Sequence, residues 1–291
     1  IYKEYVAAKE SEEILSKTPT LDIADIDVKE SSIAMDKNQM GETEVLLYPQ
    51  DTSGISYIDL YFDLRGVAED SLRNLSFFTG FIKKTDSQNM SFKEIEKQLD
   101  TYVGGLGFGV STYQSVKDPN QYRPTLTVSL RFLNENKDKA MELVKELMTG
   151  AQFAPADRLK NLIDEVKTGM VSGISYRAPS LSMSAASKSF FPALGAFDEE
   201  TGGGVFENYV LKTDFDASKM SEKLKGLVST VFNQQRLYLA SITSSQGDLG
   251  TLESSIGQLK KALPKEGTAD QKWSFDAQEN YDGFAIPGEV Q

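Results

Sequence analysis

The most informative segment of the chain reads ISYIDLYFDL at residues 55–64, EDSLRNLSFFTGFIKKT at 69–85, SFKEIEKQLDTYV at 91–103 and GGLGFGV at 104–110. In its first part apolar and polar residues alternate, with Ile58, Leu60, Phe62 and Leu64 on one side and Tyr57, Asp59, Tyr61 and Asp63 on the other. Alternation of this kind is typical of a strand with one buried face. It therefore predicts a strand over Ile55–Leu64.

Two helices and a glycine-rich strand follow in the same segment. Apolar residues at three- and four-residue spacing predict one helix over Glu69–Thr85, with a stripe of Leu72, Leu75, Phe78 and Ile82. Ser91 and Glu94 have the spacing of a capping box, which predicts a second helix that runs to about Val103. In the strand expected at 104–110, one face consists of Gly105, Gly107 and Gly109 and carries no side chains.

The remaining elements follow from the same two kinds of pattern, alternation for strands and three- and four-residue spacing for helices. Strands are expected at 31–36, 44–48, 122–133 and 236–243, and helices at 2–16, 136–150, 154–170, 181–191, 216–232 and 249–263. The first two strands are expected to form a hairpin, with residues 37–41 as its loop. Together these elements predict an α+β fold, a mostly antiparallel mixed sheet covered on one face by helices.

Composition excludes several classes of function. The chain has 291 residues, 40% of them hydrophobic, which is enough for a substantial core. It has no cysteine and no histidine, so it cannot form a Ser-His-Asp triad, a Cys-His dyad or a His-ligated zinc site. The absence of cysteine is compatible with a reducing compartment.

Charge and hydropathy limit the partners. The formal net charge is -12, whereas a nucleic-acid-binding surface must neutralise phosphates. No run of residues approaches the length of apolar sequence that a membrane span needs. We therefore expect neither nucleic acid nor a membrane as a partner.

The order of strand, helix, helix and double-glycine strand resembles the half-module of the pitrilysin/insulinase (inverzincin) metallopeptidases, of the LuxS/MPP-like metallohydrolase type. Matching SFKEIEKQLDTYVGG (91–105) to that family's second helix and double glycine places its H-x-x-E-H zinc motif on residues 75–79. The histidine positions are then Leu75 and Thr79, and the general-base position is Phe78. The third zinc ligand of the family corresponds to Glu165, which alone is expected to be a solvated helix charge.

The resemblance extends to the presequence-protease branch and implies a domain organisation. It rests further on the Ala154-Pro-Ala-Asp157 helix start and on Ile286-Pro-Gly-Glu-Val290 near the C-terminus. Residues 1–19 are expected to be a helical connector from a preceding half, 20–265 a non-catalytic peptidase-like module, and 266–291 a linker and the first strand of a following module. The resemblance implies the third, peptidase-associated module of a longer polypeptide, with no cofactor in this chain and zinc in the parent protein.

Three functions remain open at this stage. The resemblance implies a non-catalytic part of a zinc peptidase, whose partners are other modules of the same polypeptide and peptide substrates. The alternative of the same fold is an inactive structural subunit used in assembly. A third hypothesis is an unrelated hydrolase that uses carboxylates such as Asp59, Asp63 and those of Asp198–Glu200, although exposed carboxylates are more commonly solvated charges.

The candidate peptide-binding residues are Tyr57, Tyr61, Gly107 and Gly109. In the family that this chain resembles, sheet faces and strand edges line a peptide chamber. Glycines let a peptide approach a strand closely, but they equally let a helix pack there. Asp59 and Asp63, on the same side of their strand as the two tyrosines, are expected to favour basic peptides.

Overall fold

The computed structural model describes residues 2–7, 16–17, 19–26, 32–118 and 121–275. It divides into two units, residues 1–34 and 35–291. The first unit contains helix α1 (Tyr2–Ala7) and a 3-10 turn, η1 (Ile23–Asp25). The helix predicted over 2–16 is thus present in its first residues, while 8–15 lie outside the described part of the chain.

A six-stranded mixed sheet organises the second unit. Its strand order is β1 (Asp36–Met40), β2 (Thr43–Pro49), β8 (Leu237–Ser244), β3 (Ile55–Asp63), β6 (Tyr122–Leu133) and β5 (Gly105–Gln114). Strands β2 and β8 pair in parallel, and the other neighbours pair antiparallel. A separate ribbon joins β4 (Asp86–Ser87) to β7 (Ala151–Ala154). The α+β prediction with a mostly antiparallel mixed sheet is confirmed.

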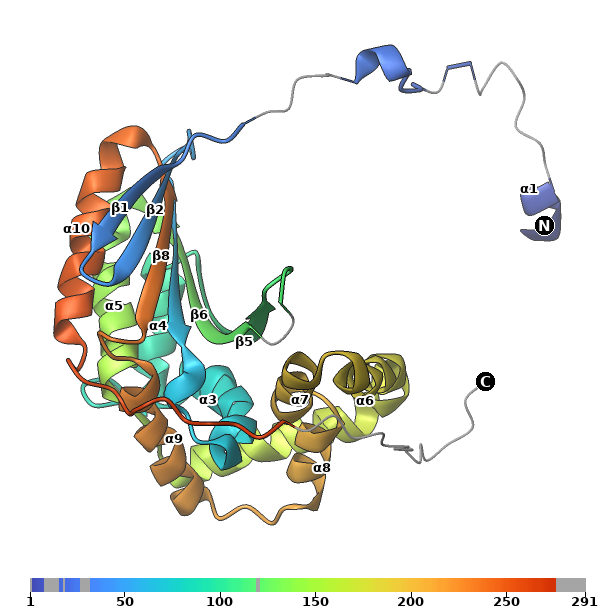
Figure 1. Ribbon diagram of the computed structural model, residues 1–291, viewed down its shortest axis with the longest axis vertical. Coiled ribbons are helices and arrows are strands. Elements are labelled where there is room, and N and C mark those ends of the chain that lie inside the picture. The colour runs from blue at the N-terminus through green and yellow to red at the C-terminus, as the bar shows by residue number, and fades with distance from the viewer. Residues whose placement is uncertain (1, 8–15, 18, 27–31, 119–120, 276–291) are drawn as a thin grey trace. The chain divides into compact units, whose positions relative to one another are not determined.

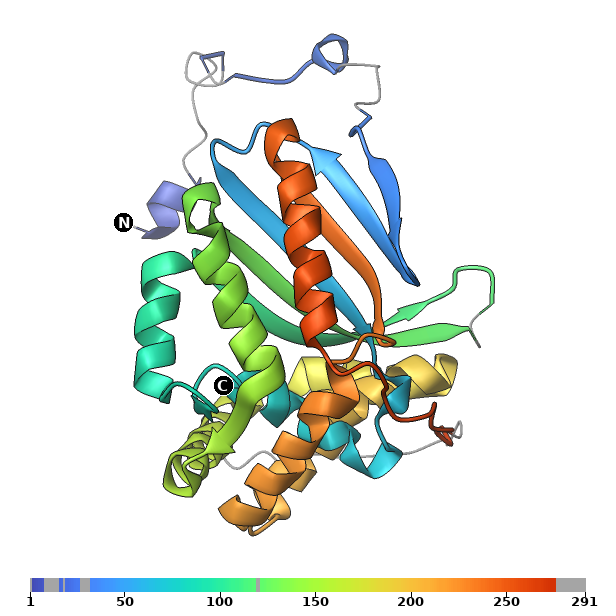
Figure 2. The ribbon, with the colours of Figure 1, turned by 90° about the vertical axis from the view of Figure 1, so that its left-hand side faces the viewer.

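Helices cover one face of this sheet and gather at one of its ends. Figures 1 and 2 show α4 (Phe92–Tyr102), α5 (Lys137–Gly150) and α10 (Gln246–Ala262) lying along the same face. The end of the sheet meets α3 (Leu75–Phe81), α6 (Ala156–Phe190), α7 (Pro192–Thr201), α8 (Gly204–Lys212) and α9 (Ala217–Val231). Among the described residues, no helix combines the length and apolar character needed to span a bilayer.

The strand patterns place the core as predicted. Ile58, Leu60 and Phe62 of β3 are at most 2% exposed and face the helices. The alternating residues Leu126, Val128, Leu130 and Phe132 of β6 are also buried. Because side chains alternate across a strand, the opposite face of both strands is turned away from this core.

Three predicted elements differ in the structure. The first hairpin strand lies at Asp36–Met40, where a loop was predicted; this edge strand is almost wholly exposed, so it has no alternation to detect. The predicted 69–85 helix begins as 3-10 helix η3 (Glu69–Asn74) and becomes α3 at Leu75. A three-residue spacing keeps side chains on one face of either helix type, so the pattern could not separate them. The segments predicted from 154 to 191 form one helix, α6, with Pro179 inside it.

The segment after α10 packs back onto the rest of the second unit. The indole of Trp273 stacks on Phe197 with ring centroids 5.9 Å apart, and its Nε1 donates to the carbonyl of Val67 at 2.9 Å. The Thr268 hydroxyl donates to the carbonyl of Gly66 at 2.7 Å. The predicted strand of a following module lies in 276–291, outside the described residues, and the predicted domain limits remain predictions.

Candidate functional site

The positions that correspond to the zinc motif do not converge on a metal site. Leu75 and Phe78 are fully buried, which confirms that both are core residues. The Thr79 hydroxyl donates to the carbonyl of Leu75 at 3.0 Å, and Glu165 is exposed on α6. Within the described residues, no group of three Asp or Glu side chains could hold a metal ion. These residues therefore do not fit a zinc ion.

We call the sheet face opposite α4, α5 and α10 the open face (Figure 1). The predicted peptide-binding residues lie together on it, because they alternate along β3 and β5 with the residues that face the helices. Three rows of cross-strand neighbours in β3, β6 and β5 form its centre: Tyr57, Arg131 and Gly105; Asp59, Ser129 and Gly107; and Tyr61, Thr127 and Gly109. The register thus brings Tyr57, Tyr61, Gly107 and Gly109 onto one surface. They lie on the two strands that flank β6, and the alternation along each strand turns them to the same face.

The glycines on this face serve two different purposes. A Cβ atom added to Gly107 or Gly109 would meet no atom within 4 Å, so neither glycine is there to admit a packed helix. A Cβ on Gly105 would lie 2.6 Å from Nε of Arg131. The same Nε donates a hydrogen bond to the carbonyl of Gly104 at 2.9 Å. Gly105 therefore makes room for the Arg131 side chain, whereas Gly107 and Gly109 leave open surface.

A hollow of about 400 Å³ occupies this part of the open face. Its lining includes Tyr57, Asp59, Gly107, Ser129 and Arg131. Tyr57 is 42% exposed, so its ring is available to a ligand. A phenol ring on the same sheet face as the open Gly107 and Gly109 suits contact with an extended peptide, because the ring offers apolar area and a hydroxyl at a small cost in side-chain entropy.

Asp59 is the acidic group at the centre of this surface. The described structure gives its carboxylate no hydrogen bond and no ion pair, although Tyr57 and Tyr61 flank it along β3. Burial raises the pKa of Tyr61 to about 12, with further contributions from Asp59 and from three nearby tyrosines, Tyr113, Tyr238 and Tyr48. Sequence reasoning missed these three tyrosines because it could not place β8 beside β3, or β2 and β5 one strand further out on either side.

Asp63 lies on the same side of β3 as Asp59 and Tyr61, as predicted, but its carboxylate is buried and ion-paired and is not available to a peptide. It is 5% exposed, and its carboxylate accepts from Nε and Nη2 of Arg65 at 2.9 and 2.6 Å. Nη1 of Arg236 lies 4.0 Å from the other carboxylate oxygen. β3 keeps its register with β6 through Asp63, which lies opposite Thr125, while its pairing with β8 shifts after Tyr61. Asp63 is therefore part of an ion-pair cluster that joins β3 to the segment before β8.

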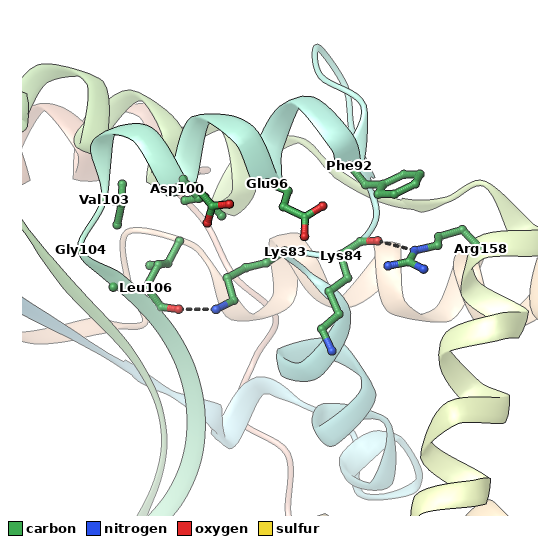
Figure 3. A pocket seen from close by; sticks show the side chains of 11 residues that line it. Lys83, Lys84, Phe92, Glu96, Asp100, Val103, Gly104, Leu106 and Arg158 are labelled. Carbon is green, nitrogen blue, oxygen red and sulfur yellow. Dashed lines mark hydrogen bonds between the residues drawn. The ribbon is translucent and has the colours of Figure 1, made fainter.

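The free edge of β5 is partly occupied by a lysine. Nζ of Lys83 donates to the carbonyl of Leu106, as Figure 3 shows. Burial and the charge of Lys84 lower the pKa of Lys83. A hollow of about 330 Å³ beside it is also lined by Glu96, Asp100 and Arg158. Lysines commonly protect edge strands from pairing, so a peptide that adds to β5 here must displace Lys83.

Comparison with known proteins identifies the family of the chain. The family model described as peptidase M16 (subfamily C) associated matches residues 2–209. The chain belongs to this peptidase-associated family.

Two curated relatives of this peptidase-associated chain match it over only part of their own length. It is 22% identical to Protein HypA of Clostridium perfringens over 291 residues, which cover 99% of this chain and 30% of that protein. It is 22% identical to the mitochondrial presequence protease of Drosophila melanogaster over 227 residues, covering 74% of this chain and 21% of that protein. The chain thus spans less than a third of the length of these relatives.

Solved structures confirm the M16 fold. An inactive peptidase M16 domain from Pseudomonas fluorescens superposes with a TM-score of 0.58 at 15% identity, covering 84% of this chain and 54% of that one. Pitrilysin superposes with a TM-score of 0.55 at 14% identity, covering 84% of this chain and 24% of that one. The resemblance drawn from the sequence is confirmed at the level of family and fold.

Three of the carboxylates considered for an unrelated hydrolase, those of Asp63, Glu199 and Glu200, have structural partners in this peptidase-associated chain. Asp63 is held by arginines, and Oε2 of Glu200 lies 3.0 Å from Nη2 of Arg73. Glu199 is buried and accepts from the backbone N–H of Val205 at 3.2 Å. A pair of catalytic carboxylates needs one group free to take up a proton and one to remain charged. Ion pairing of Asp63 and Glu200 does not favour that role.

Proposed function

We propose that this chain is a non-catalytic module of a multi-domain zinc metallopeptidase, and that its open face forms part of the wall that binds peptides. The single observation that carries the proposal is the exposed hollow that includes Tyr57 and Gly107, on a sheet whose opposite face is covered by helices. Family membership supports the peptidase context. The zinc of such a peptidase is then held outside this chain, since Leu75, Phe78, Thr79 and Glu165 do not fit it.

The surface chemistry supports contact with an extended peptide. At Gly107 and Gly109 a peptide main chain can approach the strand within van der Waals distance, because no side chain separates them. Tyr57 and Tyr61, both on β3, offer ring faces on either side of Asp59. A basic side chain placed there gains the Asp59 carboxylate and the face of a tyrosine. We therefore propose that Asp59 alone, without Asp63, favours basic peptides.

Peptide binding by the chain tests this proposal directly. Fluorescence anisotropy with labelled, unstructured peptides of about ten residues measures affinity without requiring catalysis. We expect Tyr57→Ala to weaken binding by about tenfold, which corresponds to about 1.4 kcal/mol for an exposed aromatic contact. The matched control is Tyr176→Ala, which removes a tyrosine that is 90% exposed on α6, outside the sheet.

The two variants separate the possible outcomes. Loss of affinity in Tyr57→Ala with no change in Tyr176→Ala supports the open face as the binding surface. Equal losses in both variants indicate nonspecific contact with exposed tyrosines. If the wild-type chain binds no peptide at micromolar concentration, the alternative of a structural assembly subunit is favoured.

A further inference from the structure

The second half of α6 presents an apolar stripe to solvent. Tyr176, Met183 and Phe190 recur at seven-residue spacing and are 90, 72 and 78% exposed. Pro179 and Ala186, also exposed, fall between them. The five positions follow the three- and four-residue alternation of the a and d seam of a coiled coil. Seven residues of helix rise about 10.5 Å, so the three large side chains are evenly spaced along one face.

Charge is missing from this face. The exposed residues between 168 and 190 include no Asp, Glu, Lys or Arg, although a quarter of the whole chain is charged. The charged residues in that range, Arg177 and Lys188, are only partly exposed, and Nη2 of Arg177 lies 3.2 Å from the buried Glu207 carboxylate. The helix therefore directs the charge of Arg177 toward α8 and its large apolar side chains outward.

The opposite face of α6 is already packed. Leu181 and Met170 are 2 and 6% exposed, and α7 and α8 lie against the same helix (Figure 1). Single exposed apolar residues are normal in folded proteins. A continuous, uncharged stripe of large side chains is not, and such stripes mark interaction surfaces.

We infer that this stripe is the docking surface for another module of the same polypeptide. The inference rests on the proposed function, because it takes the chain to be one module among several. The partner surface that fits is an uncharged helix face or groove with small residues, able to receive three large side chains about 10.5 Å apart. The flanking serines at 175, 182 and 189 permit close approach without introducing charge.

The size of the stripe favours a tethered partner over a second copy of the chain. Aromatic side chains bury roughly 150–250 Å² each, so three large residues bury on the order of 500 Å² on this side. A stable complex between free proteins needs about 800 Å² per partner. A module on the same chain needs less, because tethering raises its effective concentration to the millimolar range. The curated relatives, in which the matched region accounts for 21–30% of the length, provide the additional polypeptide.

Hydrogen–deuterium exchange tests the inference by comparing this chain with the full polypeptide that contains it. Residues 171–190 should exchange at least tenfold more slowly in the full polypeptide, because docking suppresses local opening of the helix. Met183→Glu should remove that protection and lower the melting temperature of the full polypeptide by several degrees. In the isolated chain, where Met183 is exposed, the same change should leave the melting temperature within about a degree.

The control variant is Ser254→Glu, which adds the same charge at an exposed position of α10. It should change neither exchange nor melting in either protein. Two results would overturn the inference. One is equal exchange of residues 171–190 in both proteins. The other is an isolated chain that sediments as a dimer and becomes monomeric on Met183→Glu. Peptide binding at the open face is measured separately, so loss of peptide binding with retained protection refutes the proposed function alone.

Discussion

Replacement of Phe78 by alanine is the sharpest test of whether α3 stabilises the core at the position that the sequence resemblance matches to the family's general base. Phe78 lies on α3, is fully buried, and contacts the rings of Phe153 and Phe232 at centroid distances of 5.3 and 5.7 Å. Removing a buried phenylalanine side chain costs about 3–5 kcal/mol, from lost transfer free energy and from the cavity that remains. Two ring partners place the expected cost toward the upper part of that range.

The assay is thermal unfolding of the chain followed by circular dichroism. For a protein of this size each kcal/mol lowers the melting temperature by about 2–4 °C, so Phe78→Ala should lower it by roughly 6–20 °C. The matched control is Phe190→Ala, which removes the same side chain from a position that is 78% exposed. The control should alter stability by no more than about 0.5 kcal/mol.

The comparison of the two variants can refute the reasoning. If Phe78→Ala melts within a degree of the wild type, or no lower than Phe190→Ala, the Phe78 side chain of α3 does not stabilise the core. Urea unfolding adds a second check, because an unchanged m-value shows that the same surface is still exposed on unfolding.

Four further predictions address function and pH. In the full polypeptide, Gly107→Val should raise KM more than it lowers kcat, because a remote wall supplies uniform binding; steady-state kinetics with unchanged KM would remove this strand from the peptide path. Asp59→Asn should abolish any preference of the isolated chain for a lysine-containing over a glutamine-containing peptide, measured by anisotropy. Metal analysis of the purified chain should find no stoichiometric zinc, since the motif positions offer Leu75 and Phe78 as side chains. Burial and the charge of Glu199 raise the pKa of Asp198 in the folded protein. The contribution of Asp198 to stability is therefore fully present below its ordinary pKa of about 3.9, and it is lost as the pH rises through the raised pKa. Asp198→Asn should therefore raise the melting temperature at pH 7, with the gain shrinking toward pH 4, and a gain independent of pH would contradict this origin.

Local periodicity was enough to determine the main elements of this protein. Strand β6 has the predicted limits, and the apolar stripes of β3 and α9 are buried as their spacing required. These patterns are readable because the side-chain period of a strand or helix follows from the local backbone geometry alone. The missing histidines and the apolar character of Leu75 and Phe78 were likewise evident before the fold was known.

Only the tertiary structure decided which groups meet. Strand β8 inserts between β2 and β3, although β3 ends at Asp63 and β8 begins only at Leu237. That placement buries Asp63 beside Arg236, gathers the tyrosines of the open face, and leaves Asp59 without a charged partner among the described residues. Arg131 fills the space above Gly105, whereas the space above Gly107 stays open. Both positions are glycine, so the residue type alone could not predict this difference. The physical reason is that such contacts depend on pairing between distant strands, and local backbone preferences do not specify that pairing.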